Sequence, residues 1–170
     1  DGTGWSGWQR QPNASTIQET VEEVLTRILG GPISVMASGR TDAGVHAAHQ
    51  VCSFKTRKRF EPAVVLRGVN ALLPASICGL HLEQAPIGFH ARLWSVKKLY
   101  RYRWLTGRRK CPFRHRYAWV WGENLDFQTM SSVVPLFVGQ HDMSGFRAQG
   151  CTAKTTIRTI ESAHLFHHED

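Results

Sequence analysis

The side chain best suited to chemistry is Asp42, in the segment 38–46, SGRTDAGVH. Glycines flank this carboxylate on both sides, directly after a predicted buried strand, where loops present side chains instead of packing them. Residues two apart in an extended loop point the same way, so Arg40 is expected beside Asp42. A neighbouring guanidinium keeps a carboxylate ionised, as a nucleophile requires. From spacing alone, however, a structural Arg–Asp pair in a turn is the more common arrangement.

A second chemistry, metal-dependent hydrolysis, would use His46 and His49 with Asp42. The residues around these histidines alternate as in a strand, where a three-residue offset places side chains on opposite faces. The spacing therefore favours an ordinary loop histidine and strand histidine, and we predict no metal site. The four cysteines have neither zinc-ligand nor redox-motif spacing, which predicts reduced thiols.

Charge is the strongest regional signal. The chain has 170 residues, a formal net charge of +8 and a pI near 9.8, which favours a polyanionic partner, nucleic acid first and an anionic membrane second. Between Glu83 and Glu123 there is no acidic residue, although the stretch contains nine aromatic residues. Its cations include Lys97, Lys98, Arg101, Arg103, Arg108, Arg109, Lys110, Arg114 and Arg116. Phosphates need cations and unpaired bases need stacking surfaces. Aromatic residues that alternate along a strand more often belong to a core than to a stacking surface. The lack of acidic residues still indicates a polyanionic partner, because an ordinary solvated face carries charges of both signs.

These groups must be positioned by regular elements, and the first part of the chain predicts five of them. The first is a helix that begins at Ser15, with Gln18 completing a capping box, and ends at Gly30. Strands over 33–37 and 48–55 follow. The last two elements are a helix from Pro62 to before Pro74 and a strand over 77–83. The order α-β-β-α-β is a split βαβ, ferredoxin-like unit without its opening strand. We expect that strand to precede Asp1.

A second unit is predicted from about Trp94. Its expected elements are strands over 99–105 and around 117–121, a helix from about Asp126 to Gly139 that contains Pro135, and a strand over 155–166. We therefore predict an α+β protein with a ferredoxin-like subdomain at residues 1–92 and an incomplete α+β subdomain at residues 93–170. The catalytic cleft is expected between them. No apolar run approaches the roughly 20 residues that span a bilayer, so a soluble cytoplasmic protein is expected.

The segment SGRTDAGVHAAHQV resembles the signature of the TruA-type tRNA pseudouridine synthases. The stretches DGTGWSGWQRQ, STIQETVE, GVNALLP, FHAR, KKLYRYRW and GQHDMSGFRA resemble the same family in order and spacing. The resemblance covers nearly the whole chain. Members of that family run roughly a hundred residues further, so we expect this chain to be truncated at both ends and poorly active alone.

The resemblance implies roles for individual residues. Asp42 would be the nucleophile, Arg40 would pair with it and help to hold the flipped nucleotide, and Tyr100 would stack on the target uracil and assist proton transfer. Further substrate-binding residues would be His46, Phe89, His90, Arg92, Phe146 and Arg147. It also implies tRNA as substrate, commonly at positions 38–40 of the anticodon stem-loop, and a homodimer. The isomerisation involves no redox change, so no cofactor is expected. The competing class is a non-catalytic RNA-binding module, since ferredoxin-like units often bind RNA without chemistry.

Overall fold

The computed structural model describes residues 1–107, 111–147 and 155–167. It divides into two compact units, Asp1–Arg101 and Tyr102–Asp170. The predicted subdomain boundary between residues 92 and 93 stays a prediction.

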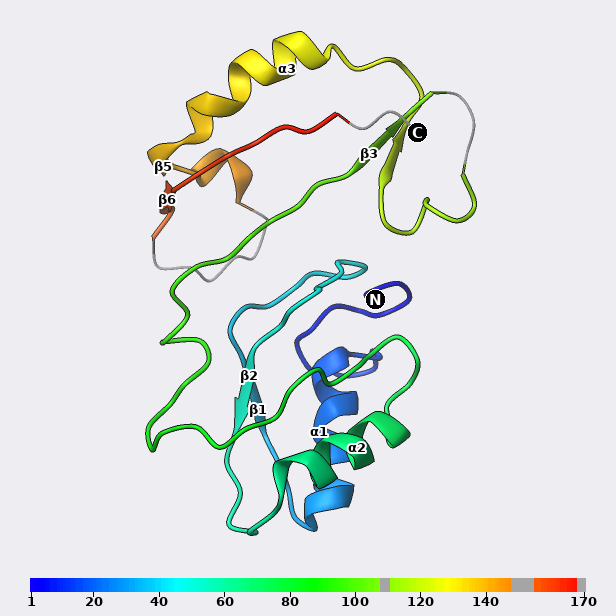
Figure 1. Cartoon of the computed structure of the whole chain (residues 1–170), viewed down its shortest axis with the longest axis vertical. Helices are drawn as coiled ribbons and strands as arrows, with labels where there is room; N and C mark the ends of the chain where they lie inside the picture. Colours follow the sequence, from blue (N-terminus) through cyan, green and yellow to red (C-terminus); the bar gives the residue numbers. More distant parts are fainter. Residues whose placement is uncertain (108–110, 148–154, 168–170) are drawn as a thin grey trace. The chain divides into compact units, whose positions relative to one another are not determined.

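Two helices in unit 1 cover one side of a short sheet (Figure 1). Helix α1 spans Ile17–Leu29 and buries Leu25 and Leu29, and helix α2 spans Pro62–Leu72 and buries Val65 and Val69. These apolar residues recur four apart, which places each pair on one helix face. Both helices therefore face a shared core, and the two helix predictions are confirmed.

The sheet of unit 1 is an antiparallel pair, β1 (Val35–Ala37) and β2 (Cys52–Phe54), with Val35 opposite Phe54. Both strands are shorter than the sequence predicts. Val35 and Ala37 are buried on the core side, whereas Met36 between them is exposed, which is the alternation of a one-sided sheet. The core they enter consists of Trp8, Leu25, Leu29, Ile33, Val35, Ala37, Val65 and Val69.

The start of α1 differs from the prediction. The N-cap is Thr16, whose side chain makes no capping hydrogen bond, so the Ser15–Gln18 capping box is wrong. Two carbonyl groups of the preceding segment replace it: Ile17 N donates to Gly7 O at 3.2 Å and Gln18 N donates to Trp8 O at 3.0 Å. These bonds satisfy N–H groups that a helix start otherwise leaves without partners.

Gln18 is instead directed to a buried carboxylate. Glu22, only 6% exposed, accepts hydrogen bonds from Val35 N at 2.9 Å, Gln18 Nε2 at 2.9 Å and Arg10 Nη1 at 3.3 Å. Gln18 Nε2 also donates to Val35 O at 3.1 Å. A buried charge is tolerated when it is paired and hydrogen-bonded. This network therefore ties α1 to the start of β1.

The strand predicted over residues 77–83 is wrong: this segment forms neither a strand nor a helix. Its backbone bonds to a helix side chain instead: Gly79 N donates to Asn70 Oδ1 at 2.7 Å, and Asn70 Nδ2 donates to Gly79 O at 2.8 Å. Alternating apolar residues alone do not supply the partner strand that a ladder requires. The fold is thus mixed α and β with short sheets.

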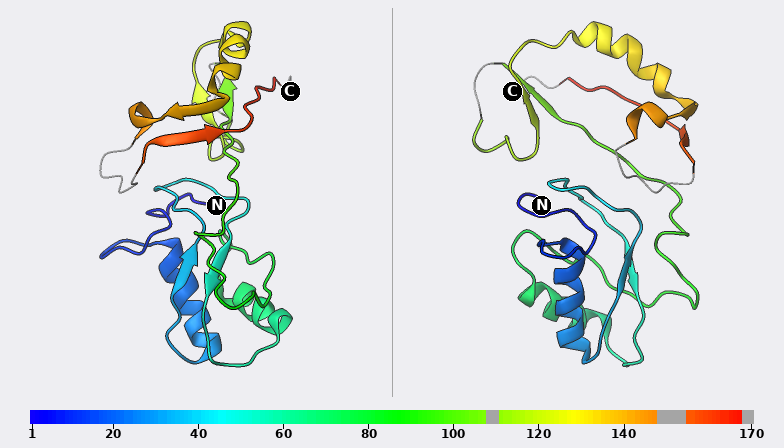
Figure 2. Two further views of the ribbon diagram at one scale, coloured as in Figure 1. Left: turned by 90° about the vertical axis from the view of Figure 1, so that its left-hand side faces the viewer. Right: turned by 180° about the vertical axis from the view of Figure 1, so that it is seen from behind.

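In the described part of unit 2, the strands form two separate pairs, β3 with β4 and β5 with β6, and Figure 2 shows them with the α-helix α3. β3 (Trp104–Thr106) is parallel to β4 (Trp119–Trp121), and β5 (Gly139–Asp142) is antiparallel to β6 (Ile157–Ile160). The strands predicted over 99–105 and 155–166 are therefore shorter than expected. β5 was not predicted at all, because Gly139 was interpreted only as a helix end.

The helix of unit 2 begins as predicted. α3 spans Phe127–Val133, and its N-cap Asp126 accepts a hydrogen bond from Thr129 N at 3.0 Å. A hydrogen bond from the Thr129 hydroxyl, followed by the one from Thr129 N, lowers the pKa of the Asp126 carboxyl. The chain then tightens into a 3₁₀ helix, η1 (Val134–Phe137). Pro135 explains the change, since proline has no N–H for the α-helical ladder. A second 3₁₀ turn, η2, spans Ser144–Phe146.

Candidate active site

The loop that carries Asp42 connects β1 to β2 and is closed at its base. Ser38 N donates to Val51 O at 2.8 Å, the Ser38 hydroxyl donates to Gln50 Oε1 at 2.7 Å, and Gln50 Nε2 donates to Gly39 O at 2.7 Å. The two arms of the loop are thus joined directly beyond the sheet. A rigid base of this kind limits how far the tip moves.

Asp42 begins a tight turn at the tip. Val45 N donates to Asp42 O at 3.1 Å, and Gly44, third in the turn, has φ +77, which glycine adopts without a steric penalty. The Asp42 and Arg40 side chains are both exposed. Among the residues that the structure describes, no ion pair joins them, and the predicted pairing stays a prediction. The carboxylate is therefore accessible to a substrate.

The N-terminal segment lies beside this loop, as Figure 1 shows for the dark-blue and pale-blue traces of unit 1. Trp8 N donates to Thr41 O at 3.0 Å, and Gly44 N donates to Trp5 O at 3.2 Å. The predicted substrate residue His46 is also engaged, because its Nδ1 accepts from Gly2 N at 3.1 Å and lies 3.1 Å from Asp1 Oδ1. The first residues were predicted only as a turn, and these contacts with the loop were not predicted. The signal in the sequence was the repeated Gly–Trp pair of GWSGW, because glycine allows the backbone of another segment to approach closely.

The FHAR segment is anchored to β2 through its alanine. Ala91 is 2% exposed, and its amide donates to the Ser53 hydroxyl at 3.2 Å. His90 Nδ1 accepts from Arg92 N at 3.2 Å, which closes a turn around the histidine. Phe89 packs edge-on against Trp94, with ring centroids 5.4 Å apart. The anchoring of Ala91 explains how this turn is held to the sheet while Arg92 is exposed.

Lys98, from the basic stretch, lies against the base of the loop that carries Asp42. Its Cε and Nζ atoms both lie 3.4 Å from the position that a Cβ on Gly39 would occupy. The sequence places Lys98 among the cations of that stretch but does not predict it as a site residue. Tyr100 follows two residues later and is 73% exposed, so its ring face is available for stacking.

Two of the predicted substrate residues belong to unit 2. Phe146 ends η2, is 76% exposed and lies 6.3 Å from Phe137 between ring centroids; Arg147 follows it. Their roles stay predictions. Arg108, Arg109, Lys110 and Cys151 lie outside the described residues.

Other reactive groups in the described chain are less suited to catalysis. Burial raises the pKa of the Cys52 thiol to about 12, so it is neutral and a poor nucleophile at ordinary pH. Within residues 1–107, 111–147 and 155–167, no three His, Cys, Asp or Glu side chains gather as metal ligands. None of the described helices has the length and apolar character to cross a membrane.

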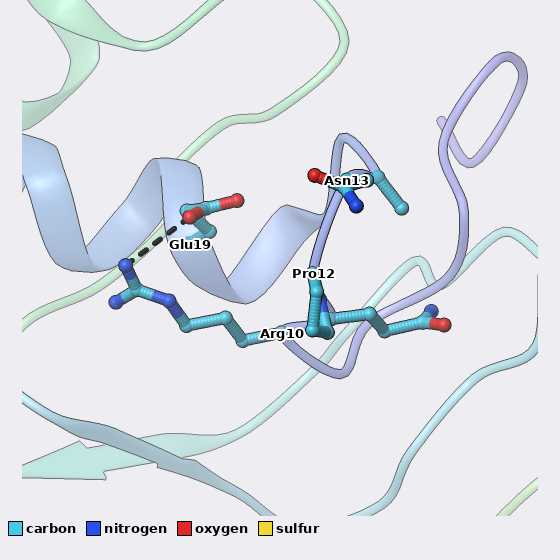
Figure 3. Close-up of a pocket in the computed structure, with 6 residues that line it drawn as sticks. Arg10, Pro12, Asn13 and Glu19 are labelled. Carbon is cyan, nitrogen blue, oxygen red and sulfur yellow. Dashed lines mark ion pairs between the residues drawn. The ribbon is translucent and has the colours of Figure 1, made fainter.

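A surface hollow of about 550 Å³ is lined by Arg10, Gln11, Pro12, Asn13, Ala14 and Glu19. Figure 3 shows the Arg10 guanidinium turned toward Glu19, with Nη2 3.1 Å from Oε1. Arg10 also bonds to Glu22, so its charge is already compensated within the protein. The lining includes no residue of the loop that carries Asp42, and the hollow is therefore not part of the candidate active site.

Comparison with known proteins finds a matching family and relatives that cover the whole chain. A family model described as tRNA pseudouridine synthase matches residues 1–92, the part that contains the Asp42 loop and FHAR. A tRNA pseudouridine synthase A from Syntrophotalea carbinolica is 43% identical over 170 residues, which is all of this chain and 68% of the relative. A protein of the same name from Geobacter sp. strain M21 is 44% identical over 165 residues, 97% of this chain and 67% of the relative.

Proposed function

Because this chain belongs to the tRNA pseudouridine synthase family, we propose that it isomerises uridine in tRNA to pseudouridine with Asp42 as the nucleophile. The observation that carries the proposal is the exposed carboxylate of Asp42 at the tip of its loop. Hydrogen bonds fix this loop both at its base and along the side that faces the N-terminal segment. Catalysis gains most from groups that are held in position before the substrate binds.

The reaction is an isomerisation whose atoms balance without a co-reactant. The bond from uracil N1 to ribose C1′ breaks, and a bond from C5 to C1′ forms after the base turns. The hydrogen on C5 is lost as a proton, and N1 gains one. Asp42 assists by attack at C6, by attack at C1′ or by promoting elimination, and each route requires an ionised carboxylate near the glycosidic bond.

A uridine stacked in RNA is not accessible to Asp42, so it must first be flipped out of the stack. We assign stacking on the flipped uracil to Tyr100, whose ring is exposed. Contact with the neighbouring phosphates is assigned to Lys98 and Arg92, and a place beside the nucleotide to Arg40. His46, Phe89, His90, Phe146 and Arg147 are proposed as further substrate contacts.

The finer parts of the proposal rest on family resemblance. They are modification at positions 38–40 of the anticodon stem-loop, action as a cytoplasmic homodimer, and a ferredoxin-like, split βαβ arrangement for the subdomain at residues 1–92. The exposed cations and aromatic rings in the acid-free stretch support a tRNA partner independently of the resemblance.

The second candidate function is RNA binding without catalysis, which the same cations and aromatic rings would support. Asp42 discriminates between the two, since a pure binder gains nothing from an exposed anion beside phosphates.

The test replaces Asp42 in the full-length protein. Asp42→Asn keeps the shape of the side chain and removes the ionised oxygen, so we expect no release of tritium from tRNA labelled at uridine C5. The dissociation constant for tRNA should change by less than about threefold, because phosphate contacts dominate binding. Glu23→Gln neutralises an exposed carboxylate on α1 and serves as the control with wild-type turnover.

Turnover by Asp42→Asn would remove Asp42 from the catalytic role, and a wild-type protein that binds tRNA without tritium release would favour the binding module. Wild-type activity should also persist with a metal chelator, and its loss would favour metal-dependent chemistry.

A further inference from the structure

We propose that the segment Trp5–Trp8 is a positioning element for the nucleophile, and that Gly7 is the residue that sets the position of Asp42. The inference rests on the proposed role of Asp42. Gly7 itself does not contact the substrate in this proposal and acts through the loop backbone.

One side of the segment is fixed to helix α1. The carbonyls of Gly7 and Trp8 accept hydrogen bonds from Ile17 N and Gln18 N, the first amides of that helix. The Trp8 ring is buried in the core cluster. Because a packed helix and its core move little, the segment has a rigid support.

The other side of the segment is bonded to the nucleophile loop. Trp8 N donates to Thr41 O, and Trp5 O accepts from Gly44 N. Thr41 precedes Asp42 and Gly44 follows it by two residues, so the two bonds bracket the nucleophile. The position of the loop tip is therefore linked to α1 through the four residues Trp5–Trp8.

The contact at Gly7 leaves no room for a side chain. A Cβ on this residue would lie 2.6 Å from Thr41 O, 3.1 Å from Asp42 C and 3.2 Å from Ala43 N. All three are backbone atoms, which cannot rotate away as a flexible side chain would. A methyl group at Gly7 would therefore displace the peptide groups on both sides of the Asp42 Cα.

Such a displacement matters because the Asp42 side chain is exposed, and its direction is determined by its backbone. A misplacement of about 1 Å at a reacting group can cost roughly 100-fold in rate. Binding of tRNA depends mainly on phosphate contacts spread over the surface, and these would not change. Gly7 is thus expected to affect the chemical step and not substrate affinity.

The experiment compares Gly7→Ala with Gly4→Ala in the full-length protein. Gly7 has φ +85 and Gly4 has φ +78, so alanine is strained at both, but a Cβ on Gly4 has no atom within 4 Å. Single-turnover rates with enzyme in excess report the chemical step in folded protein, independently of the active fraction. We expect the rate for Gly7→Ala to fall about 100-fold with an unchanged dissociation constant, and that for Gly4→Ala to stay near wild type.

Equal rates for the two variants would overturn the proposal while leaving the role of Asp42 intact. If Gly7→Ala does not fold, the amide between Gly7 and Trp8 is replaced by an ester, which removes the Trp8 N–H that donates to Thr41 O and adds no side chain. A slowed chemical step with unchanged tRNA affinity supports the proposal, and a wild-type rate overturns it. Wild-type protein without turnover would instead count against the proposed function.

Discussion

Lys98 brings a positive charge to the base of the loop whose tip is the Asp42 carboxylate. An ammonium group is a compact charge on a flexible stem, well suited to a phosphate but not to bidentate recognition. The end of the Lys98 side chain lies beside Gly39, since its Cε and Nζ atoms are 3.4 Å from where a Cβ on that residue would be. The positive charge of Lys98 is thus held next to the backbone at the base of the loop.

Lys98→Gln should weaken tRNA binding and reduce the slope of log affinity against log salt by about 1, the signature of one lost phosphate contact. The measurement is a series of filter-binding titrations at increasing NaCl. Arg67→Gln removes one exposed charge from α2 and is the matched control, with an unchanged slope. An identical slope in both variants would show that Lys98 does not contact RNA.

At the scale of the elements, the sequence predicted those whose signal is local. Leu25, Leu29, Val65 and Val69 recur at helical spacing, so both helices of unit 1 were found within a few residues. The loop around Asp42 was found for the same reason, since Gly39 and Gly44 lie close together in the sequence. The strand over 77–83 was wrong and β5 was missed, because strands depend on partners far along the chain. The contact of Trp8 with Thr41 joins residues 33 positions apart, and local patterns do not encode it.

Glu22 gives the sharpest test of how the elements are joined. Glu22→Ala should lower the free energy of unfolding by about 2–4 kcal/mol, because it leaves Val35 N and the amide of Gln18 without their acceptor in a buried place. Glu23→Ala, the next residue on α1 but exposed, should change it by less than about 0.5 kcal/mol. Urea unfolding followed by circular dichroism measures both, and equal values would mean that the network contributes nothing.

For the molecule as a whole, charge is the property with the widest effect. The net charge of +8 is unevenly distributed along the chain, since acids are absent between Glu83 and Glu123. Arg92, Lys97, Lys98, Arg101 and Arg103 are all exposed. A surface of this kind draws in a polyanion before any specific contact forms.

The affinity of the full-length protein for tRNA should therefore fall about 1,000-fold between 50 and 200 mM salt if six or more phosphates are contacted. Fluorescence anisotropy of labelled tRNA gives this dependence directly. An affinity that is insensitive to salt would mean that recognition is not carried by the cations.

The hydrogen bonds of Glu22 and Gln18 to Val35 also affect whether another chain can pair with the edge of the sheet. Both the N–H and the C=O of Val35 point away from β2 and are occupied by side chains of α1. An edge strand with free backbone groups is a template on which another chain can pair, and blocked edges prevent such growth. At Val35 the side chains of α1 therefore block part of the outer edge of β1, which hinders another strand from pairing there.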